Sequence, residues 1–482
     1  MAQRDPRHGR GRAARRWALV LVVLLVAGGL AVLRFDLADR WLDDEPASRG
    51  PAAIPPPAGL DLPALPRPRP AAEPIAAGGG GHPAAAKVRR ALTGLLADPD
   101  LGRHVVAEVA PLAGGAPLLR LGDGSAIPAS TTKLVTTSAA LLTLGPDATF
   151  ETRVVSDGRR GITLVGGGDP YLASKPADPR DEPPYPHRAD VTTLARATAA
   201  ALRERGTRKV AVTYDDTLFG GPAVNPHWPA DYVPDGVVSP ITSLWVDEGR
   251  SPTGFGRVDD PALAAATVFA KALARAGIEV EGVPEPAAAR PGAAEVASVS
   301  SAPLDQVVQR ILDVSDNEAA EVLFRQVALA DGGDGSAATA RTAVRKALAG
   351  AGIDLHGSVL HDGSGLSREN RMDPRLLVDL LRAASSARLP ELRPVVTGLP
   401  VAGFTGSLAE RFAEGDPDGR GRVRAKTGTL TGVSGLAGIA QDLDGELLVF
   451  VLLADRVALE DTLDARDALD DAAAALGGCH CA

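Results

Sequence analysis

The chain has 482 residues, of which 45% are hydrophobic and 23% are charged. This length allows roughly two to four domains, and the composition excludes a wholly disordered polyelectrolyte. With 51 basic and 60 acidic residues the net charge is −9, so we expect no nucleic-acid partner.

The chain begins with an arginine-rich segment and an apolar run. Residues 1–16 contain six arginines and one acidic residue, and residues 17–33 are an uninterrupted run of apolar or glycine residues. This run is at the short end of what spans a bilayer and slightly long for the core of a signal peptide. No good small-residue cleavage pattern follows it, so an uncleaved anchor is favoured over a cleaved signal. The arginines should stay in the cytoplasm, with the rest of the chain outside.

Residues 34–86 are predicted to be a linker. Proline, alanine and glycine dominate this segment, which includes Pro55-Pro56-Pro57. It cannot bury enough apolar surface to fold, and its prolines favour a semi-extended spacer. We therefore expect a single-pass membrane protein with an extracytoplasmic catalytic domain. Secretion after signal cleavage is the alternative.

From residue 87 onward the apolar residues recur with helical and strand-like periods. In chain order, the predicted helices are 87–96, 128–144, 189–204, 261–276, 317–329, 337–349, 374–385 and 459–476. The predicted strands are 104–109, 117–121, 153–156, 163–166, 210–214, 237–246, 423–426, 436–442 and 447–453. The fold class is α/β or α+β, with an antiparallel sheet formed partly from the C-terminal strands.

The first polar cluster is Ser130-Thr131-Thr132-Lys133, at the start of a predicted apolar helix. Residues three apart share a helix face, so the amine of Lys133 can lie beside the hydroxyl of Ser130. A serine needs a base to become a nucleophile, and a lysine in a dry cleft can have its pKa lowered enough to serve. The alternative is an ordinary helix start with a solvent-facing lysine.

The second cluster is Ser315-Asp316-Asn317, just before another helix. One interpretation is a capping box, with Ser315 as the cap and Glu318 three residues later. The other is catalytic: the Ser315 hydroxyl relays a proton to the leaving group, while Asn317 holds a substrate amide or Lys133. The two interpretations compete, because one hydroxyl cannot fully serve both tasks.

The third cluster is Lys426-Thr427-Gly428-Thr429, at the end of a predicted strand. Lys426 and Thr427 can bind a carboxylate, and Gly428 lets a substrate backbone approach closely. The backbone N–H groups of Thr429 and Ser130 can form an oxyanion hole. The chain has only seven lysines, so a chance match is rare, although a strand ending in a Thr-Gly turn is the alternative.

Together the clusters follow the order Ser-x-x-Lys, Ser-x-Asn, Lys-Thr-Gly, which is typical of β-lactamases and penicillin-binding proteins. The chain resembles the penicillin-recognising serine enzymes. More closely, it resembles their D-alanyl-D-alanine carboxypeptidase/endopeptidase branch, the class C low-molecular-mass penicillin-binding proteins. The resemblance covers about residues 88–476. It is also carried by residues 317–324 and by Gly166-Gly167-Gly168-Asp169-Pro170, Tyr214-Asp215-Asp216-Thr217-Leu218-Phe219 and Asp362-Gly363-Ser364-Gly365-Leu366-Ser367-Arg368.

The resemblance implies a β-lactamase/transpeptidase-like catalytic domain at 87–145 and 300–482, with an inserted domain at 146–299. Ser315 follows Ser130 by 185 residues, which favours this branch over a compact β-lactamase. The gap is nevertheless short for the branch. A membrane anchor with a proline-rich spacer is not general in it either.

The resemblance also implies an activity: a serine D,D-carboxypeptidase/D,D-endopeptidase acting on peptidoglycan stem peptides, with β-lactams as covalent inhibitors and no cofactor or metal. Ser130 would form the acyl-enzyme, Lys133 would be the base and Ser315 would relay the proton to the leaving D-alanine. Substrate binding would fall to Asn317, Lys426, Thr427, Gly428 and Thr429. Residues 362–366 would line or support the cleft.

Two other functions remain open. A β-lactamase on the same fold would need fast deacylation, usually assisted by a Glu-x-x-Leu-Asn element, and neither Asn225 nor Asn370 has that context. A non-catalytic peptidoglycan-binding module predicts damaged motifs, whereas all three are intact.

The remaining residues that could carry chemistry are given structural interpretations. The two cysteines, Cys479 and Cys481, exclude a disulfide scaffold and a four-cysteine zinc site, and we interpret them as part of a frayed C-terminal tail. The eight histidines show no paired spacing and are interpreted as surface or core residues. Trp228 and Trp245 are expected to pack, with stacking on a ligand as the alternative.

Overall fold

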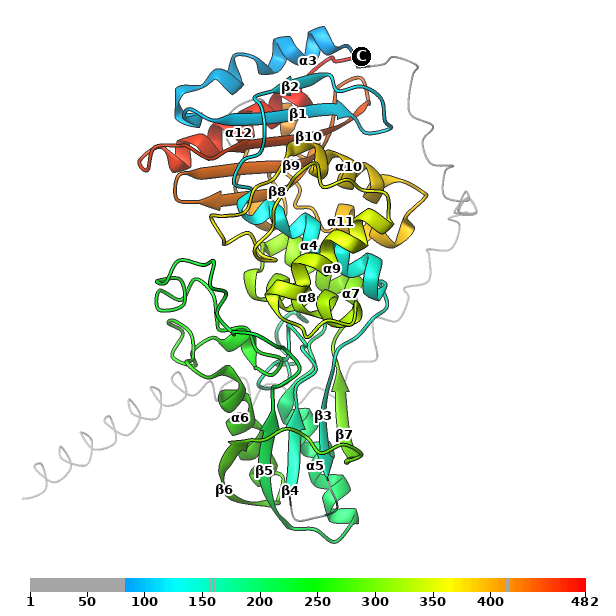
Figure 1. Ribbon diagram of the computed structural model, residues 1–482, viewed down its shortest axis with the longest axis vertical. Helices are drawn as coiled ribbons and strands as arrows, with labels where there is room; N and C mark the ends of the chain where they lie inside the picture. The colour runs from blue at the N-terminus through cyan, green and yellow to red at the C-terminus, as the bar shows by residue number, and fades with distance from the viewer. Residues whose placement is uncertain (1–82, 157, 159–160, 413–416) are drawn as a thin grey trace, which may run out of the picture. The chain divides into compact units, whose positions relative to one another are not determined.

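The computed structural model describes residues 83–482 except 157, 159–160 and 413–416 (Figure 1). The predicted cytoplasmic segment at 1–16, the predicted anchor at 17–33 and nearly all of the predicted linker at 34–86 lie outside the described residues. Within the part that is described, no helix combines the length and apolar character that a membrane span requires.

The first of two five-stranded sheets in the described residues is antiparallel throughout, with the order β2-β1-β10-β9-β8 (blue and orange-red in Figure 1). Its first strands come from the start of the folded region and its other strands from the end. β1 and β10 pair directly, and β8 is an edge strand. The strands are β1 Val105–Pro111, β2 Leu119–Leu121, β8 Val423–Leu430, β9 Val433–Gln441 and β10 Leu447–Ala454.

Helices cover both faces of this sheet, which explains why β10 is apolar at nearly every position. Successive side chains of a strand point to opposite faces. Val449 and Val451 join a core with α4, α7, α8, α9 and α10, whereas Leu448 and Phe450 join a core with α3 and α12. These helices are α3 Ala85–Leu92, α4 Thr132–Leu144, α7 Leu304–Val314, α8 Asn317–Ala330, α9 Ala337–Gly350, α10 Pro374–Ser385 and α12 Thr462–Gly477.

The second sheet lies between α4 and α7 in the chain and has the order β6-β5-β4-β3-β7. β4, β5 and β6 are parallel, whereas β3 runs antiparallel to both its neighbours. Two crossover helices, α5 and α6, share its apolar core. The elements are β3 Glu151–Ser156, β4 Gly161–Val165, α5 Val191–Glu204, β5 Lys209–Asp215, α6 Pro261–Arg275, β6 Glu279–Pro286 and β7 Ala294–Ser300.

The predicted fold class is confirmed, since an antiparallel sheet is flanked by helices in a mixed α/β chain. The strand predicted at 237–246 is wrong. That segment has no strand pairing, and Pro240 in its middle cannot donate to a ladder. Its apolar residues Val238, Ile241 and Trp245 instead fix an irregular loop in a small core, together with Trp228.

The C-terminal tail is not frayed, so that interpretation is also wrong. Cys479 and Cys481 form a disulfide, and Cys481 is fully buried. Its carbonyl accepts a hydrogen bond from the amide of Ala84, and the carbonyl of Cys479 accepts one from Leu443. The tail is thus held between the start of α3 and the turn that joins β9 to β10.

Candidate active site

The Ser-x-x-Lys motif lies in a strained turn that leads into α4. Residues Ala129–Thr131 form a 3-10 turn, and Ala129 has a positive φ of 46°. Ser130 is half-buried, whereas Lys133 is fully buried in the first turn of α4. Non-glycine residues with positive φ are strained, and such strain is often found at functional sites. The turn presents the Ser130 hydroxyl to the amine of Lys133.

Lys133 is the centre of the first cluster. Its ammonium donates hydrogen bonds of 2.8 Å to three oxygen atoms: Ser130 Oγ, Asn317 Oδ1 and the carbonyl of Ser364. Burial lowers the pKa of Lys133 to about 8, although the acidic groups of Asp316 and other neighbours oppose the shift. A large share of Lys133 is therefore neutral slightly above neutral pH, as a general base must be.

Ser315 is not the N-cap of α8, so the capping-box interpretation is wrong. It ends α7 in the left-handed conformation, with φ 63° and ψ 43°. The cap of α8 is Asp316, whose Oδ1 accepts from the amide of Ala319 at 2.9 Å. Glu318 pairs instead with Arg257 at 2.6 Å. The Ser315 hydroxyl is thus free of a capping role.

Ser315 contacts the third motif. Lys426 is fully buried in β8, and its Nζ donates to Ser315 Oγ at 2.8 Å and to the carbonyl of Thr427 at 2.8 Å. Thr427 Oγ1 lies 3.3 Å from the same Nζ and 3.1 Å from Ser407 Oγ. Burial, followed by the charges of Lys133 and Arg411, holds the pKa of Lys426 well below its ordinary value.

The motif lies inside β8, not at its end, because the strand runs on to Leu430. Gly428 faces the catalytic turn: a Cβ there would lie 2.7 Å from the carbonyl oxygen of Pro128 and 3.3 Å from the amide nitrogen of Ser130. A side chain at this position would therefore push β8 away from Ser130. Thr429 follows on the exposed side of the same strand. Its part in an oxyanion hole stays a prediction.

The three motifs form one site. Lys133 of the first motif binds Asn317 of the second, and Lys426 of the third binds Ser315 of the second. The seven residues after His361 also belong to the site, because the carbonyl of Ser364 accepts a hydrogen bond from Lys133. Each ammonium group therefore binds one serine hydroxyl at 2.8 Å, and the two pairs are brought together by the Ser315–Asn317 segment, which contacts both lysines.

The sequence analysis missed Glu321. Its Oε1 accepts from the amides of Gly363 and Ser364 at 2.9 and 2.7 Å, so it fixes the segment whose carbonyl binds Lys133. Glu321 is buried in α8, and burial raises its pKa to about 8. The available signal was an acidic residue amid the apolar residues of a helix, which is costly unless it is paired or hydrogen-bonded.

Comparison with known proteins agrees with this geometry. The chain matches the D-Ala-D-Ala carboxypeptidase 3 (S13) family over residues 88–255 and 251–476. It belongs to that family. This confirms the resemblance drawn from the motifs and the predicted enzyme class, a serine D-Ala-D-Ala carboxypeptidase.

Relatives from several bacteria align over most of the chain. Carboxypeptidase Rv3627c of Mycobacterium tuberculosis is 38% identical, covering 83% of this chain and 85% of that protein. Carboxypeptidase DacB of Mycolicibacterium smegmatis is 37% identical, covering 81% and 84%. The crystal structure of penicillin-binding protein 4 (dacB) from Haemophilus influenzae matches with a TM-score of 0.62 at 22% identity, covering 78% of this chain and 93% of that one. That likeness concerns the fold.

Proposed function

We propose that this S13-family enzyme removes the terminal D-alanine from peptidoglycan stem peptides through an acyl-enzyme on Ser130. One observation carries the proposal: Lys133 Nζ lies 2.8 Å from Ser130 Oγ in a site that also holds Ser315 and Lys426. A nucleophile, its base, a relay hydroxyl and a buried cation are thus within reach of one bound peptide end.

Acylation begins with neutral Lys133. Its amine takes the proton of Ser130 Oγ, and the oxygen attacks the carbonyl carbon of the penultimate D-alanine. The carbonyl oxygen gains negative charge, which the amide N–H groups of Ser130 and Thr429 stabilise. Asn317 and the Ser364 carbonyl hold the resulting ammonium of Lys133 in place.

Collapse of this intermediate releases D-alanine. The Ser315 hydroxyl gives its proton to the leaving amine and takes in return the proton that Lys133 removed from Ser130, so Lys133 is neutral again before deacylation. An ester on Ser130 remains, and water attacks it, with Lys133 again taking the proton. The free acid leaves and the Ser130 hydroxyl is restored, so atoms and charge balance over the cycle. A cross-linked amine as leaving group gives the D,D-endopeptidase reaction.

Lys426 accounts for selection of a free carboxylate. It is fully buried, and the partners that it contacts are the neutral oxygens of Ser315 and Thr427. A buried cation without a contacting anion is unfavourable. The terminal carboxylate of the substrate would supply that anion, and Thr427 would add a hydroxyl.

The edge of β8 supports a way of docking the peptide. β9 occupies one side of β8, and among the residues that the structure describes the other side is bridged only at Arg424, by Val401. Beyond that point β8 passes the catalytic turn at Gly428. A stem peptide laid along this edge as an added strand would place its carbonyl near Ser130.

We also propose that the enzyme works on the outer face of a membrane, tethered through residues 17–33. The arginine-rich flank and the apolar run support this location. The substrate class fits, because peptidoglycan lies outside the membrane.

Covalent labelling tests the proposal. Purified protein is treated with penicillin, digested with pepsin and analysed by mass spectrometry, with Ser130→Ala as control. We expect an adduct on Ser130 that is released slowly, and D-alanine release from uncross-linked and cross-linked muropeptides. An adduct at another residue would refute the site. Rapid penicillin turnover would support the β-lactamase alternative.

A further inference from the structure

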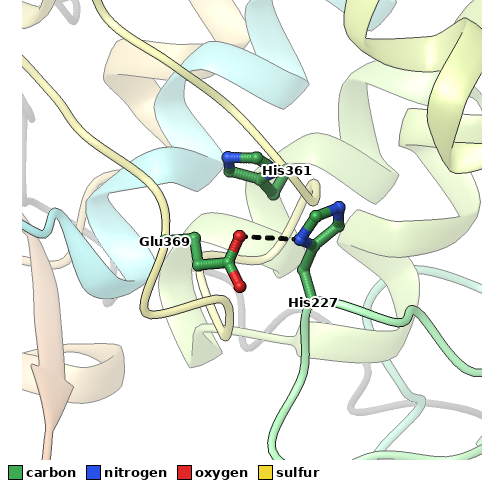
Figure 2. A group of neighbouring side chains, drawn as sticks. All are labelled: His227, His361 and Glu369. Carbon is green, nitrogen blue, oxygen red and sulfur yellow. Dashed lines mark hydrogen bonds and ion pairs between the residues drawn. The ribbon is translucent and has the colours of Figure 1, made fainter.

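A second cluster of ligand-type side chains lies outside the catalytic residues. His227, His361 and Glu369 meet between two loops, and each offers one ligand atom within 4.8 Å of the others (Figure 2). His227 Nδ1 lies 2.8 Å from Glu369 Oε2, and the two imidazole rings are 4.2 Å apart at their centroids. The sequence shows no paired spacing for these histidines, because 134 residues separate His227 from His361.

We propose that His227, His361 and Glu369 bind a divalent transition metal of the zinc class. Two imidazoles and one carboxylate are a donor set found in zinc sites with three protein ligands and one open position. Bonds of about 2.0–2.2 Å in a tetrahedron place ligand atoms about 3.3 Å apart, so the observed group needs only small side-chain rotations to close on an ion. This proposal is independent of the proposed function.

The two histidines are held in place by a buried asparagine. Asn225 Oδ1 accepts from the amide of His227 at 3.0 Å, and its Nδ2 donates to the carbonyl of His361 at 2.9 Å. Asn370 adds a second support, because its Oδ1 accepts from the amide of His361 at 2.7 Å. Both asparagines are buried. Backbones fixed in this way pre-organise ligands, which is what a binding site needs.

Asparagine is rare in this chain, which makes this use of it informative. Only three occur in the whole sequence, Asn225, Asn317 and Asn370. Asn317 binds the catalytic lysine, and the other two frame the histidine pair. All three asparagines of the chain thus lie either at the Lys133 site or beside the histidine pair.

The cluster is accessible to an ion from solvent. Glu369 is exposed, and the side chain of His227 retains 32% of its accessible surface. Both histidines line a cavity of about 280 Å³, with Asp334 and Ser336 on its wall. One cation lies beside the site: Arg341 is 3.4 Å from His361 Nδ1, a long contact that a ring rotation can give up.

A bound metal would restrain residues 361–369, the segment whose backbone accepts a hydrogen bond from Lys133. His361 and Glu369 stand at the two ends of a nine-residue segment that contains Ser364, whose carbonyl accepts from Lys133. The ion would join these ends to the loop of His227, next to Trp228, whose Nε1 already donates to Asp362. Binding should therefore stabilise this part of the folded protein.

The test uses full-length protein without a polyhistidine tag, with its disulfide intact and stripped of metal with EDTA. ZnCl2 is titrated calorimetrically, and CoCl2 is followed by its visible absorption. We expect one Zn²⁺ per chain at micromolar or tighter affinity, a four-coordinate Co²⁺ spectrum and a rise in Tm of at least about 2 °C.

The variants His227→Gln, His361→Gln and Glu369→Gln should each weaken Zn²⁺ binding at least about tenfold, and remove the Tm rise. His356→Gln is the matched control, because His356 Nε2 also lies 2.8 Å from a carboxylate, that of Asp379, outside the cluster. Glu369 is exposed, so its variant should fold even if a histidine variant does not. Failure to bind Zn²⁺ stoichiometrically, or equal binding by Glu369→Gln and wild type, would overturn the proposal.

Discussion

Lys133 and Lys426 are both fully buried, and the partners that their ammonium groups contact are neutral oxygens. Burial penalises their charged forms, yet the two lysines need opposite charge states in the proposed cycle. Lys133 must be neutral before attack, and Lys426 must be charged once a carboxylate is bound. The carboxylate of the bound substrate would account for the opposite charge states, because we expect it to contact Lys426 and to stabilise the charged form of that lysine.

The first prediction concerns pH. Only neutral Lys133 can accept the Ser130 proton, so the rate of acylation by penicillin should rise about tenfold per pH unit below the pKa of about 8 and level off above it. Lys133→Ala should lower the rate by about 10²–10⁴-fold and flatten the profile. Rapid-quench labelling across pH 6–9 measures both. An unchanged profile in Lys133→Ala would exclude Lys133 as the base.

The second prediction concerns the substrate carboxylate. Lys426→Ala should reduce kcat/KM for peptides ending in a free carboxylate by about 10–100-fold, the range expected for one charged hydrogen bond. Amidated peptides should lose much less, since they offer no anion. Lys346→Ala is the control, because Lys346 is exposed and pairs with Asp331 on the surface. Equal losses for both peptide types would remove the carboxylate-binding role.

At this scale the sequence singled out the motif residues better than the residues that support them. Ser130, Lys133 and Lys426 could be singled out because they stand in short motifs, and the structure brings these motifs together, while their catalytic roles stay predictions. The role of Ser315 stayed open, since a serine three residues before a glutamate also fits a capping box. The backbone excludes the capping box, because Asp316 caps α8 and Ser315 lies in the left-handed region, while the relay role of Ser315 stays a prediction. Glu321 and the His227–His361 pair depend on contacts between distant segments.

Among the elements, the turn Ala129–Thr131 has backbone from another segment packed directly against it. Gly365 packs against it so closely that an added Cβ would lie 1.8 Å from the carbonyl oxygen of Ala129. Gly365 also has a φ of +87°. The segment after His361 can therefore lie this close to the turn Ala129–Thr131 only because residue 365 is a glycine.

A matched pair of substitutions tests this contact. Gly365→Ala should abolish labelling of Ser130, because the methyl group must displace the turn. Gly357→Ala carries a similar penalty for its φ of +78°, but open space surrounds its Cβ position. It should cost about 1–2 kcal/mol in the free energy of unfolding and leave labelling within about twofold. Urea unfolding and penicillin labelling measure the two effects, and normal labelling of Gly365→Ala would contradict the argument.

Most elements with apolar periodicity were predicted, and two strands without it were missed. β10 is apolar throughout and α4 carries Leu134, Val135, Leu141 and Leu142, and both were found close to their observed bounds. β6 and β7 are edge strands with mostly exposed side chains, so no alternation marks them. α7 was also missed, although Leu304, Val307, Val308, Ile311 and Leu312 follow helical spacing on its buried face.

For the whole molecule, the N-terminal segment carries a prediction of its own. If residues 17–33 remain as an anchor, protein isolated from cell membranes should show an intact mass that includes residues 1–33. It should also resist extraction by alkaline carbonate, because the apolar run is held in the bilayer. A shortened chain released into the extracellular fraction would instead establish the cleaved signal.

The pairing of β1 with β10 has a consequence for how the chain matures. During synthesis β1 emerges early, but the strand that completes its ladder emerges only near the end. The second sheet, by contrast, is built from one continuous stretch and can close while the ribosome is still working. A nascent chain therefore lacks a complete site until its last strands are made, because Lys426 lies on β8, in the sheet that β10 and β1 complete. The three motifs can come together only when synthesis is nearly finished.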